Sequence, residues 1–268
     1  MLFDTHSHIF LCKKDNDDII KTLKENNVKH IIHIWVDIES SKTCIELSKK
    51  YNDTFCSVWI HPCYTYKNKL DIHENIKKLE DLIENNRKHI KAIWECWLDN
   101  YHLNKENPNK EQEIQKQYFI EQIKLAQKYD LPVVIHTREA KEETLEIIKK
   151  TGLKKFILHC FSEDLDFAMK AIYYSNECKI SFSWIVTYKK AENVIKTAAN
   201  IPLEKILIET DCPYLSPQKV RWEENNPINV KYNLEQIIKL RQENWKNETN
   251  EKIEKTIFEN SLKIFSIK

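Results

Sequence analysis

Two histidines separated by one residue lie near the start of the chain, in the segment FDTHSHIF. If this segment is a strand, His6 and His8 project to the same side, because side chains in a strand alternate with a period of two. Two imidazoles that point the same way can hold one metal ion. Histidines at strand ends are also often held by hydrogen bonds alone, so this pair does not by itself establish a metal site.

Four further side chains of metal-ligand type follow other apolar runs. They are Glu95 in AIWECWLD, His136 in VVIHTRE, His159 in FILHCFS and Asp211 in LIETDCP. Polar side chains at the ends of five strands are expected of a site and not of a core. Because five or six ligands exceed what one tetrahedral ion needs, we predict two divalent cations bridged by a carboxylate. Such ligands suit zinc, manganese or magnesium without choosing among them.

These side chains need a scaffold that brings distant segments together. Short apolar runs alternate with longer stretches of helical period along the chain. The predicted strands are residues 2–6, 31–35, 55–60, 90–94, 132–136, 156–159, 179–182 and 205–208. The predicted helices are residues 17–26, 41–51, 72–86, 111–129, 142–150, 165–174, 189–199, 233–242 and 251–265. Eight buried strands separated by helices predict an α/β fold, a parallel eight-stranded (β/α)₈ TIM barrel with the candidate ligands at its C-terminal face.

The chain offers no obvious place to divide it into domains. Its 268 residues, 41% of them hydrophobic, suffice for one large core, and no Pro/Ser-rich linker interrupts them. We therefore predict a single domain over residues 1–268. The longest polar connection, residues 100–110, follows the fourth strand and is a candidate substrate loop, since such connections lie on the catalytic face of a barrel.

Composition excludes several other classes. Forty-two Lys and Arg against 41 Asp and Glu give a net charge of +1, so any affinity for phosphate must be local. The chain has neither a run of about 18 apolar residues nor a signal peptide, which predicts a soluble cytoplasmic protein without a membrane partner. Eight cysteines without a CxxC pair indicate reduced thiols and no zinc ribbon. A monomer is the favoured oligomeric state.

The order and spacing of the motifs resemble the TatD family of metal-dependent deoxyribonucleases, within the amidohydrolase superfamily. The segments that carry the resemblance are FDTHSH, IHP at 60–62, ECWLD, IHTREA, LHCFS, ISFSWIVT, ETDCPYLSP and a closing N-x4-F at Asn260 and Phe265. The resemblance runs nearly end to end. It implies a barrel with two divalent metal ions that hydrolyses phosphodiester bonds at DNA ends, typically by 3′–5′ removal of nucleotides.

The resemblance also implies a place for each ligand. The first ion would be held by His6, His8 and Asp211 and the second by His136 and His159, with Glu95 as the bridge. A water made acidic by the cations would attack phosphorus, and Asp211 is the natural acceptor of its proton. Arg138 could clamp a phosphate, or form a surface ion pair instead. His61 matches the IHP motif and is a candidate substrate contact, with a structural role as the alternative.

Six of the seven tryptophans stand where the family pattern has glycine: Trp35, Trp59, Trp94, Trp97, Trp184 and Trp222. The chain contains one glycine, where a frequency of about 7% predicts about 19. Overpacking one tight site costs about 1–3 kcal/mol, which makes six independent changes improbable. We hypothesise that UGA codons, read as glycine by the source organism, were translated as tryptophan. UGG codons at these positions would refute the hypothesis, and genuine tryptophans would predict a distorted site.

A second departure concerns charge near the substrate. Arg221 is followed by Trp222, Glu223 and Glu224, where the family usually has basic residues, and these carboxylates should weaken nucleic-acid affinity. Two other functions therefore stay open. One is hydrolysis of a small amide, ester or lactone, although a bridging Glu95 in place of a modified lysine favours the nuclease. The other is a catalytically silent barrel that acts by binding.

Overall fold

The computed structural model describes residues 1–35, 37–60, 71–101, 108–244 and 247–268, and the side chains of residues 95–97 and 99 lie outside this description. Strands and helices alternate along the chain. The strands are β1 (Leu2–Ser7), β2 (Val28–His33), β3 (Thr54–Val58), β4 (Ile90–Asp99), β5 (Val133–Arg138), β6 (Phe156–Leu158), β7 (Lys179–Phe182) and β8 (Ile206–Ile208). The α-helices are α1 (Asn16–Glu25), α2 (Ile38–Lys50), α4 (Ile72–Asn86), α5 (Pro108–Lys128), α6 (Lys141–Thr151), α7 (Leu165–Tyr174), α8 (Glu192–Asn200), α9 (Val230–Asn244) and α10 (Asn250–Ile264). The short 3₁₀ helices are η1 (Ile9–Leu11), η2 (Trp184–Thr187), η3 (Leu203–Lys205), η4 (Gln218–Val220) and η5 (Pro227–Asn229).

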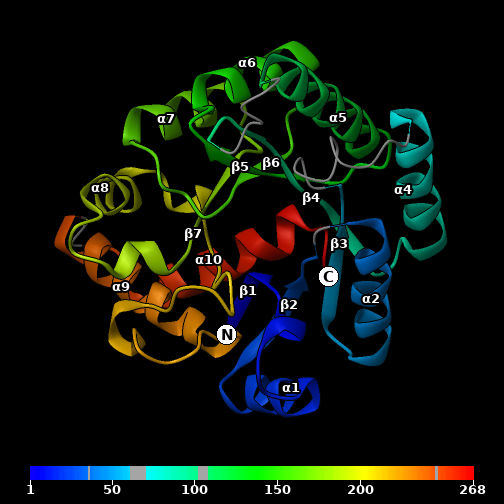
Figure 1. Ribbon diagram of the computed structural model, residues 1–268. Helices are drawn as coiled ribbons and strands as arrows, with labels where there is room; N and C mark the ends of the chain where they lie inside the picture. Colours follow the sequence, from blue (N-terminus) through cyan, green and yellow to red (C-terminus); the bar gives the residue numbers. More distant parts are fainter. Residues whose placement is uncertain (36, 61–70, 102–107, 245–246) are drawn as a thin grey trace.

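The strands form one sheet in sequence order, and each pairs in parallel with the next. The Thr5 hydroxyl donates to the Ile208 carbonyl at 3.0 Å, and Ser7 forms a parallel bridge with Cys212. These contacts bring β1 next to β8 and nearly close the barrel. Helices surround the strands (Figure 1). The predicted (β/α)₈ barrel is confirmed, so the C-terminal ends of all strands face one end of the molecule.

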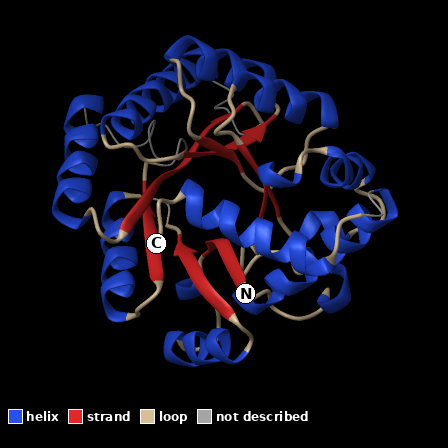
Figure 2. Ribbon diagram, turned by 180° about the vertical axis from the view of Figure 1, so that it is seen from behind, coloured by secondary structure: helices blue, strands red, loops and turns tan. Residues whose placement is uncertain are grey.

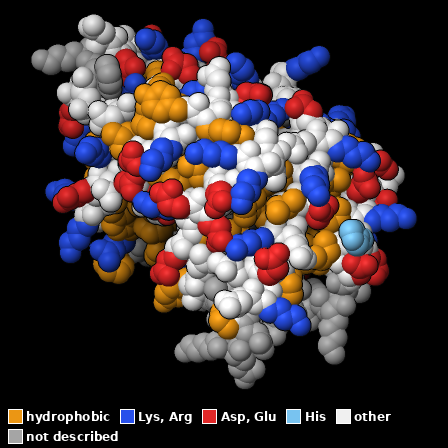
Figure 3. All heavy atoms as spheres, turned by 90° about the horizontal axis from the view of Figure 1, so that it is seen from above, with side chains coloured by type: hydrophobic (Ala, Val, Ile, Leu, Met, Phe, Trp, Pro, Cys, Tyr) orange, Lys and Arg blue, Asp and Glu red, His pale blue; other side chains and the backbone are white. Residues whose placement is uncertain are grey.

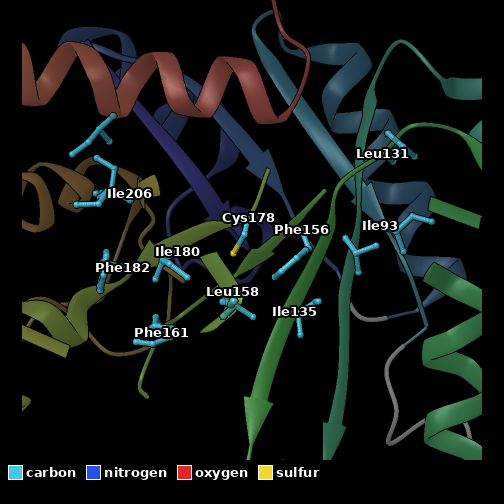
Figure 4. Close-up of a cluster of buried hydrophobic side chains, with 14 of the residues drawn as sticks. Ile93, Leu131, Ile135, Phe156, Leu158, Phe161, Cys178, Ile180, Phe182 and Ile206 are labelled. Carbon is cyan, nitrogen blue, oxygen red and sulfur yellow. The ribbon is translucent and has the colours of Figure 1, made fainter. Parts of the chain in front are cut away.

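Both faces of the strands are buried, which explains their nearly continuous apolar sequence. In β5, Val133, Val134 and Ile135 are inaccessible to solvent. Val134 packs in the inner core, whereas Val133 and Ile135 pack in the larger cluster between sheet and helices. Figure 4 shows part of this outer cluster, including Ile135 and Leu158. The sheet therefore forms the middle of two apolar layers.

Local signals fix the ends of several helices. The Asp164 carboxylate accepts a hydrogen bond from the Phe167 amide at 2.8 Å and caps the start of α7. Asp37 does the same for α2 through the Ser40 amide at 2.7 Å. Gly152 follows α6 with φ 69°, the left-handed conformation in which a side chain is strained. The single glycine of the chain is therefore a helix C-cap.

Helix α10 closes the N-terminal end of the barrel. The Asn260 side-chain amide donates to the carbonyls of Leu203 and Ile206, both at 2.9 Å. The Phe265 ring lies 5.7 Å from the Phe3 ring, centroid to centroid. Seen from behind, a helix crosses the barrel in this place (Figure 2). The closing N-x4-F motif therefore serves the end opposite the candidate ligands.

Some element boundaries differ from the predicted ones. Strand β2 begins at Val28 and ends before Trp35, and helix α8 begins at Glu192 instead of residue 189. Lys189 and Lys190 are exposed and lie in a turn closed by the Ala191 amide on the Tyr188 carbonyl at 2.9 Å. Helix α5 begins at Pro108, so the candidate substrate loop is shorter than predicted, and its residues 102–107 lie outside the described residues.

The tryptophans differ in how tightly they are packed. The Trp35 and Phe10 ring centroids are 3.3 Å apart, closer than the usual 4.5–7 Å, and Trp59 donates its indole N–H to the Trp35 carbonyl. Trp222 is 89% exposed, so it overpacks nothing. Positive φ angles in the described chain fall at other residues than Trp35, Trp59, Trp94, Trp184 and Trp222. The close contact of Trp35 involves its side chain, and glycine at position 35 would relieve it.

The surface and the helices suit a globular protein. Basic and acidic side chains are interspersed over the face in Figure 3, as the near-zero net charge predicts. Within the described chain, no helix combines the length and apolar character needed to span a bilayer.

His33 ends β2 as a fully buried histidine. Its neighbours Ile32 and Ile34 belong to the inner core, so alternation directs the His33 ring outwards, toward the helices. Within the described part of the chain, neither ring nitrogen has a hydrogen-bond partner. Burial lowers the pKa of His33 from 6.5 to about 3, which keeps the imidazole neutral.

This shift predicts an acid-sensitive fold. Below pH 6.5 the unfolded chain binds a proton at His33 that the folded chain does not, so stability falls as pH drops from 6.5 toward 3. Between pH 6.5 and 5 the loss from this group is about 1.6 kcal/mol, because the slope rises from half of about 1.36 kcal/mol per pH unit at pH 6.5 to nearly the full value at pH 5. In His33→Leu this part should vanish. Urea unfolding of both proteins at several pH values measures it, and parallel pH profiles would contradict it.

Candidate metal centre

Two imidazole nitrogens and one carboxylate oxygen lie close together where β1 and β8 end. His6 Nε2 lies 2.8 Å from His8 Nε2 and 3.2 Å from Asp211 Oδ1, and His8 Nε2 lies 3.7 Å from the same oxygen. Both histidines are buried, and Asp211 is partly exposed. The structure therefore brings together the three side chains predicted to hold the first ion, within the mouth of the barrel.

Backbone contacts between β1 and the segment after β8 hold this triangle. The Asp211 amide donates to the His6 carbonyl at 3.0 Å. The buried Asp4 carboxylate accepts hydrogen bonds from the Thr210 amide at 2.8 Å, the Thr210 hydroxyl at 2.6 Å and the His6 amide at 3.2 Å. Asp211 itself has φ 59°, a left-handed conformation that Asp tolerates better than most residues. Asp4 is thus a positioning residue that the sequence interpretation missed.

The surroundings keep the imidazoles in a form that binds cations. His8 Nδ1 lies 2.9 Å from the Ile34 carbonyl, a contact in which Nδ1–H donates and Nε2 keeps its lone pair. Burial lowers the pKa of His6 well below its ordinary value, and His159, His8 and His136 lower it further. Metal ligation requires neutral imidazole. Burial also raises the pKa of the Asp211 carboxyl.

A second group of possible ligands adjoins the first. His6, His159 and Glu209 each offer a ligand atom within 4.8 Å of the others, and all three are buried. The His6 and His159 rings stack with centroids 4.6 Å apart. His159 Nδ1 lies 3.2 Å from Glu209 Oε1. Two adjacent clusters that share His6 are compatible with a pair of cations.

Glu209 is held by several donors. Its Oε1 accepts the Cys160 amide at 2.6 Å as well as the His159 imidazole, and its Oε2 accepts the Ser181 hydroxyl at 2.6 Å. A carboxylate so engaged is suited to orient His159 and to direct His159 Nε2 toward a cation. The sequence carries a signal for it, because Glu209 directly follows β8 and stands two residues before Asp211. The same strand-end argument that found Asp211 applies to Glu209.

The other predicted site residues are placed as follows. The His136 ring lies 5.1 Å from the His159 ring, so β5 also contributes an imidazole to this mouth. Arg138, at the end of β5, is exposed and stacks on Tyr101 with its guanidinium carbon 4.7 Å from the ring centroid. Glu95 lies in β4, but its side chain is outside the description. His61 also falls outside the described residues.

Trp94 forms the floor of the site. Its ring centroid is 4.5 Å from that of His6 and 5.5 Å from that of His159, and the residue is inaccessible to solvent. The indole N–H of Trp94 lacks a partner among the described residues. Among the tryptophans at expected glycine positions, Trp94 lies against two candidate ligands, and the side chain of Trp97 is outside the description.

The donor set fits a divalent cation. Two ligand atoms at about 2.0–2.1 Å from one ion and at a right angle are about 2.9 Å apart, close to the 2.8 Å between the nitrogens of His6 and His8. The cysteines that follow the ligands, Cys160 and Cys212, are buried and belong to neither ligand group. Mixed imidazole and carboxylate donors are typical of hydrolytic metal centres.

Comparison with known proteins agrees with this chemistry. The family model described as TatD related DNase matches residues 3–266. An uncharacterized metal-dependent hydrolase of Bacillus subtilis, YabD, is 33% identical over 275 aligned residues, with all of both chains covered. An uncharacterized metal-dependent hydrolase of Buchnera aphidicola, BU355, is 32% identical and covers 90% of this chain and 92% of its own.

A solved structure has the same fold. The crystal structure of YJJV, a TatD homologue from Escherichia coli, superposes with a TM-score of 0.87 at 24% identity. The match covers 100% of this chain and 98% of the other. The arrangement of strands and helices is therefore one that a related sequence adopts.

Proposed function

Since the chain belongs to the TatD-related DNase family and is a metal-dependent hydrolase, we propose that it cleaves phosphodiester bonds at DNA ends and removes nucleotides in the 3′–5′ direction. The observation that carries the proposal is the convergence of His6, His8, His159 and Asp211 at the C-terminal end of the barrel, with Glu209 behind them. His136 and Glu95 complete the proposed ligand set from β5 and β4.

Different side chains of the site would have different roles in phosphodiester hydrolysis. A pair of divalent cations, when bound, supplies Lewis acidity that polarises phosphoryl oxygens and makes a nearby water acidic. Asp211 accepts the proton of the attacking water, a role favoured by the raised pKa of its partly buried carboxyl. The lowered pKa of His6 keeps its imidazole neutral, and the Nδ1 contact of His8 with the Ile34 carbonyl leaves His8 Nε2 free to bind a cation. Arg138 donates hydrogen bonds to a substrate phosphate from the rim of β5.

The experiment is to measure bound metal and nucleotide release on one preparation. Metal content is determined by elemental analysis, and end-labelled single-stranded DNA is incubated with and without a chelator. We expect divalent metal in the purified protein and stepwise release of nucleotides from the 3′ end that the chelator abolishes. A parallel assay on RNA of the same sequence measures the preference for DNA over RNA. A strand labelled at its 5′ end shows from which end the nucleotides are removed.

Each deviation has a definite meaning. Nucleotide release that persists in chelator would contradict the two-metal mechanism. Metal uptake without any nuclease activity would refute the proposal in favour of a hydrolase acting on a small amide, ester or lactone. A protein that takes up no metal would be a barrel that acts by binding.

A further inference from the structure

A cavity of about 630 Å³ lies between the loops that follow β7 and β8. It is lined by Tyr188, Lys189, Lys190, Gln218 and Arg221. In a parallel barrel such loops stand at the C-terminal end of the strands. The loop after β8 begins with Glu209 and Asp211, so the cavity shares its end of the barrel with the candidate metal centre.

Side-chain hydrogen bonds tie the two loops together. The Tyr188 hydroxyl donates to the Ser216 carbonyl at 2.8 Å. The Gln218 main-chain amide donates to the Thr187 hydroxyl at 2.8 Å. The walls of the cavity are thus fixed relative to each other and do not depend on a single long loop.

The lining carries positive charge that the protein does not neutralise. Lys189, Lys190 and Arg221, the basic rim, are exposed, and across the described chain none of them forms an ion pair. Lys219 nearby pairs with Glu235 at 3.5 Å instead. The whole chain has a net charge of only +1, so these three residues form a local cluster of positive charge at the cavity.

Two acidic residues, Glu223 and Glu224, follow Arg221 beside the basic rim. Glu224 Oε2 accepts a hydrogen bond from the Lys13 main-chain amide at 3.1 Å, in the loop after β1. The Arg221 guanidinium carbon lies 5.9 Å from the Tyr188 ring centroid and 4.9 Å from that of Trp222. The hydrogen bond from the Lys13 amide directs the Glu224 carboxylate toward the loop after β1 but leaves its charge in place, and Glu223 is exposed, so the expectation that these carboxylates weaken phosphate binding stays a prediction.

We propose that the basic rim binds backbone phosphates of the substrate strand away from the bond that is cleaved. This inference rests on the proposed nuclease function and adds to it a second contact point for the strand. Lysine and arginine donors match phosphate oxygens, and the Tyr188 ring offers a face on which a base can stack. A strand held at both the metal centre and the basic rim would be bound more tightly than a terminal nucleotide alone.

The test measures binding and not turnover. The probe is a fluorescent oligothymidylate of about 12 nucleotides with phosphorothioate linkages at its 3′ end to slow cleavage. The triple variant K189Q/K190Q/R221Q is compared with K21Q/K24Q/K29Q, three exposed lysines of the segment from α1 to the start of β2. Both variants change the net charge from +1 to −2, so an effect of overall charge would appear in both.

We expect only the basic-rim variant to lose affinity. For single strands the slope of log K against log salt is about −0.7 per phosphate contacted, so loss of three contacts should flatten the slope by about 2. Between about 50 and about 200 mM salt, the unmodified chain and the control variant should then lose about 16-fold more affinity than the basic-rim variant.

The results separate the two proposals. Equal slopes in the two triple variants would overturn the inference, and cleavage of unmodified DNA by the natural chain would then leave the proposed function standing. A flattened slope confined to the basic-rim variant supports the inference. If the natural chain nevertheless cleaves no DNA, the proposed function fails alone.

Discussion

Replacement of Asp211 by asparagine is expected to lower kcat for nucleotide release by about 10²–10⁴-fold while the chain remains folded. Asp211 Oδ1 lies 3.2 Å from His6 Nε2 and 3.7 Å from His8 Nε2, so the carboxylate is placed to bind a cation and to take a proton beside it. An amide oxygen is a weaker ligand and accepts no proton at neutral pH. Both contributions to the reaction are therefore lost together.

The fold should tolerate this change because asparagine can adopt the same backbone conformation. Residue 211 has φ 59°, and asparagine, like aspartate, is among the residues that visit the left-handed region. The amide of residue 211 can still donate to the His6 carbonyl. The kcat is measured on end-labelled single-stranded DNA, with Tm as the check on folding. Asp166→Asn, in an exposed ion pair on α7, is the control.

The rate that remains in Asp211→Asn tests whether Asp211 is the proton acceptor. An Asp211→Asn variant that keeps more than about a tenth of the natural rate would remove Asp211 from the position of proton acceptor. The same loss of rate in Asp166→Asn would show that the assay responds to surface charge and not to the site.

The barrel and most of the site were predictable because strand periodicity and strand ends carry the information. His6 and His8 share a side by alternation, and the ends of parallel strands meet at one face, so residues far apart in sequence such as His159 and Asp211 had to approach each other. No knowledge of loop conformation was needed for this. The predictions for His61 and for the loop at residues 102–107 concern residues outside the described part of the chain, so they stay predictions.

The position of Glu209 at a strand end was open to the same argument, but the hydrogen-bonding roles of Asp4 and Glu209 could not be predicted in this way. A residue that acts through hydrogen bonds to another segment is recognised only when its partners are known, and those of Glu209 come from the ends of β6 and β7. The tryptophans illustrate a related limit. The sequence predicted overpacking at these positions but could not show which residue would crowd each tryptophan, and Trp35 is crowded by the side chain of Phe10, which is distant in sequence.

Glu209→Gln is expected to weaken binding of one divalent cation by about 10–100-fold, the usual cost of losing a carboxylate that orients a histidine ligand. The negative charge of Glu209 beside His159 Nδ1 makes the imidazole a better ligand at Nε2. Glutamine keeps the shape of the side chain but not the charge. The affinity is measured by competition with a chromophoric chelator, with Glu204→Gln, an exposed residue of η3, as the control.

The buried environment permits glutamine at this position without collapse of the site. The amide oxygen can accept from the Cys160 amide, while the amide nitrogen faces Ser181, whose hydroxyl can accept as well as donate. Glu209→Ala would instead leave the Cys160 amide without its partner, at a cost of about 1–3 kcal/mol. Comparison of Tm for the two variants therefore separates loss of charge from loss of structure.

The number of bound ions distinguishes orientation from direct ligation. If Glu209 orients His159, the glutamine variant still binds as many cations at saturating metal as the natural chain, with one of them held more weakly. If Glu209 is itself an indispensable ligand, one cation is lost at every concentration. Unchanged cation affinity in Glu209→Gln would contradict either role. A carboxylate held by three donors, with one oxygen 3.2 Å from His159 Nδ1, would then contribute nothing to cation binding at this site.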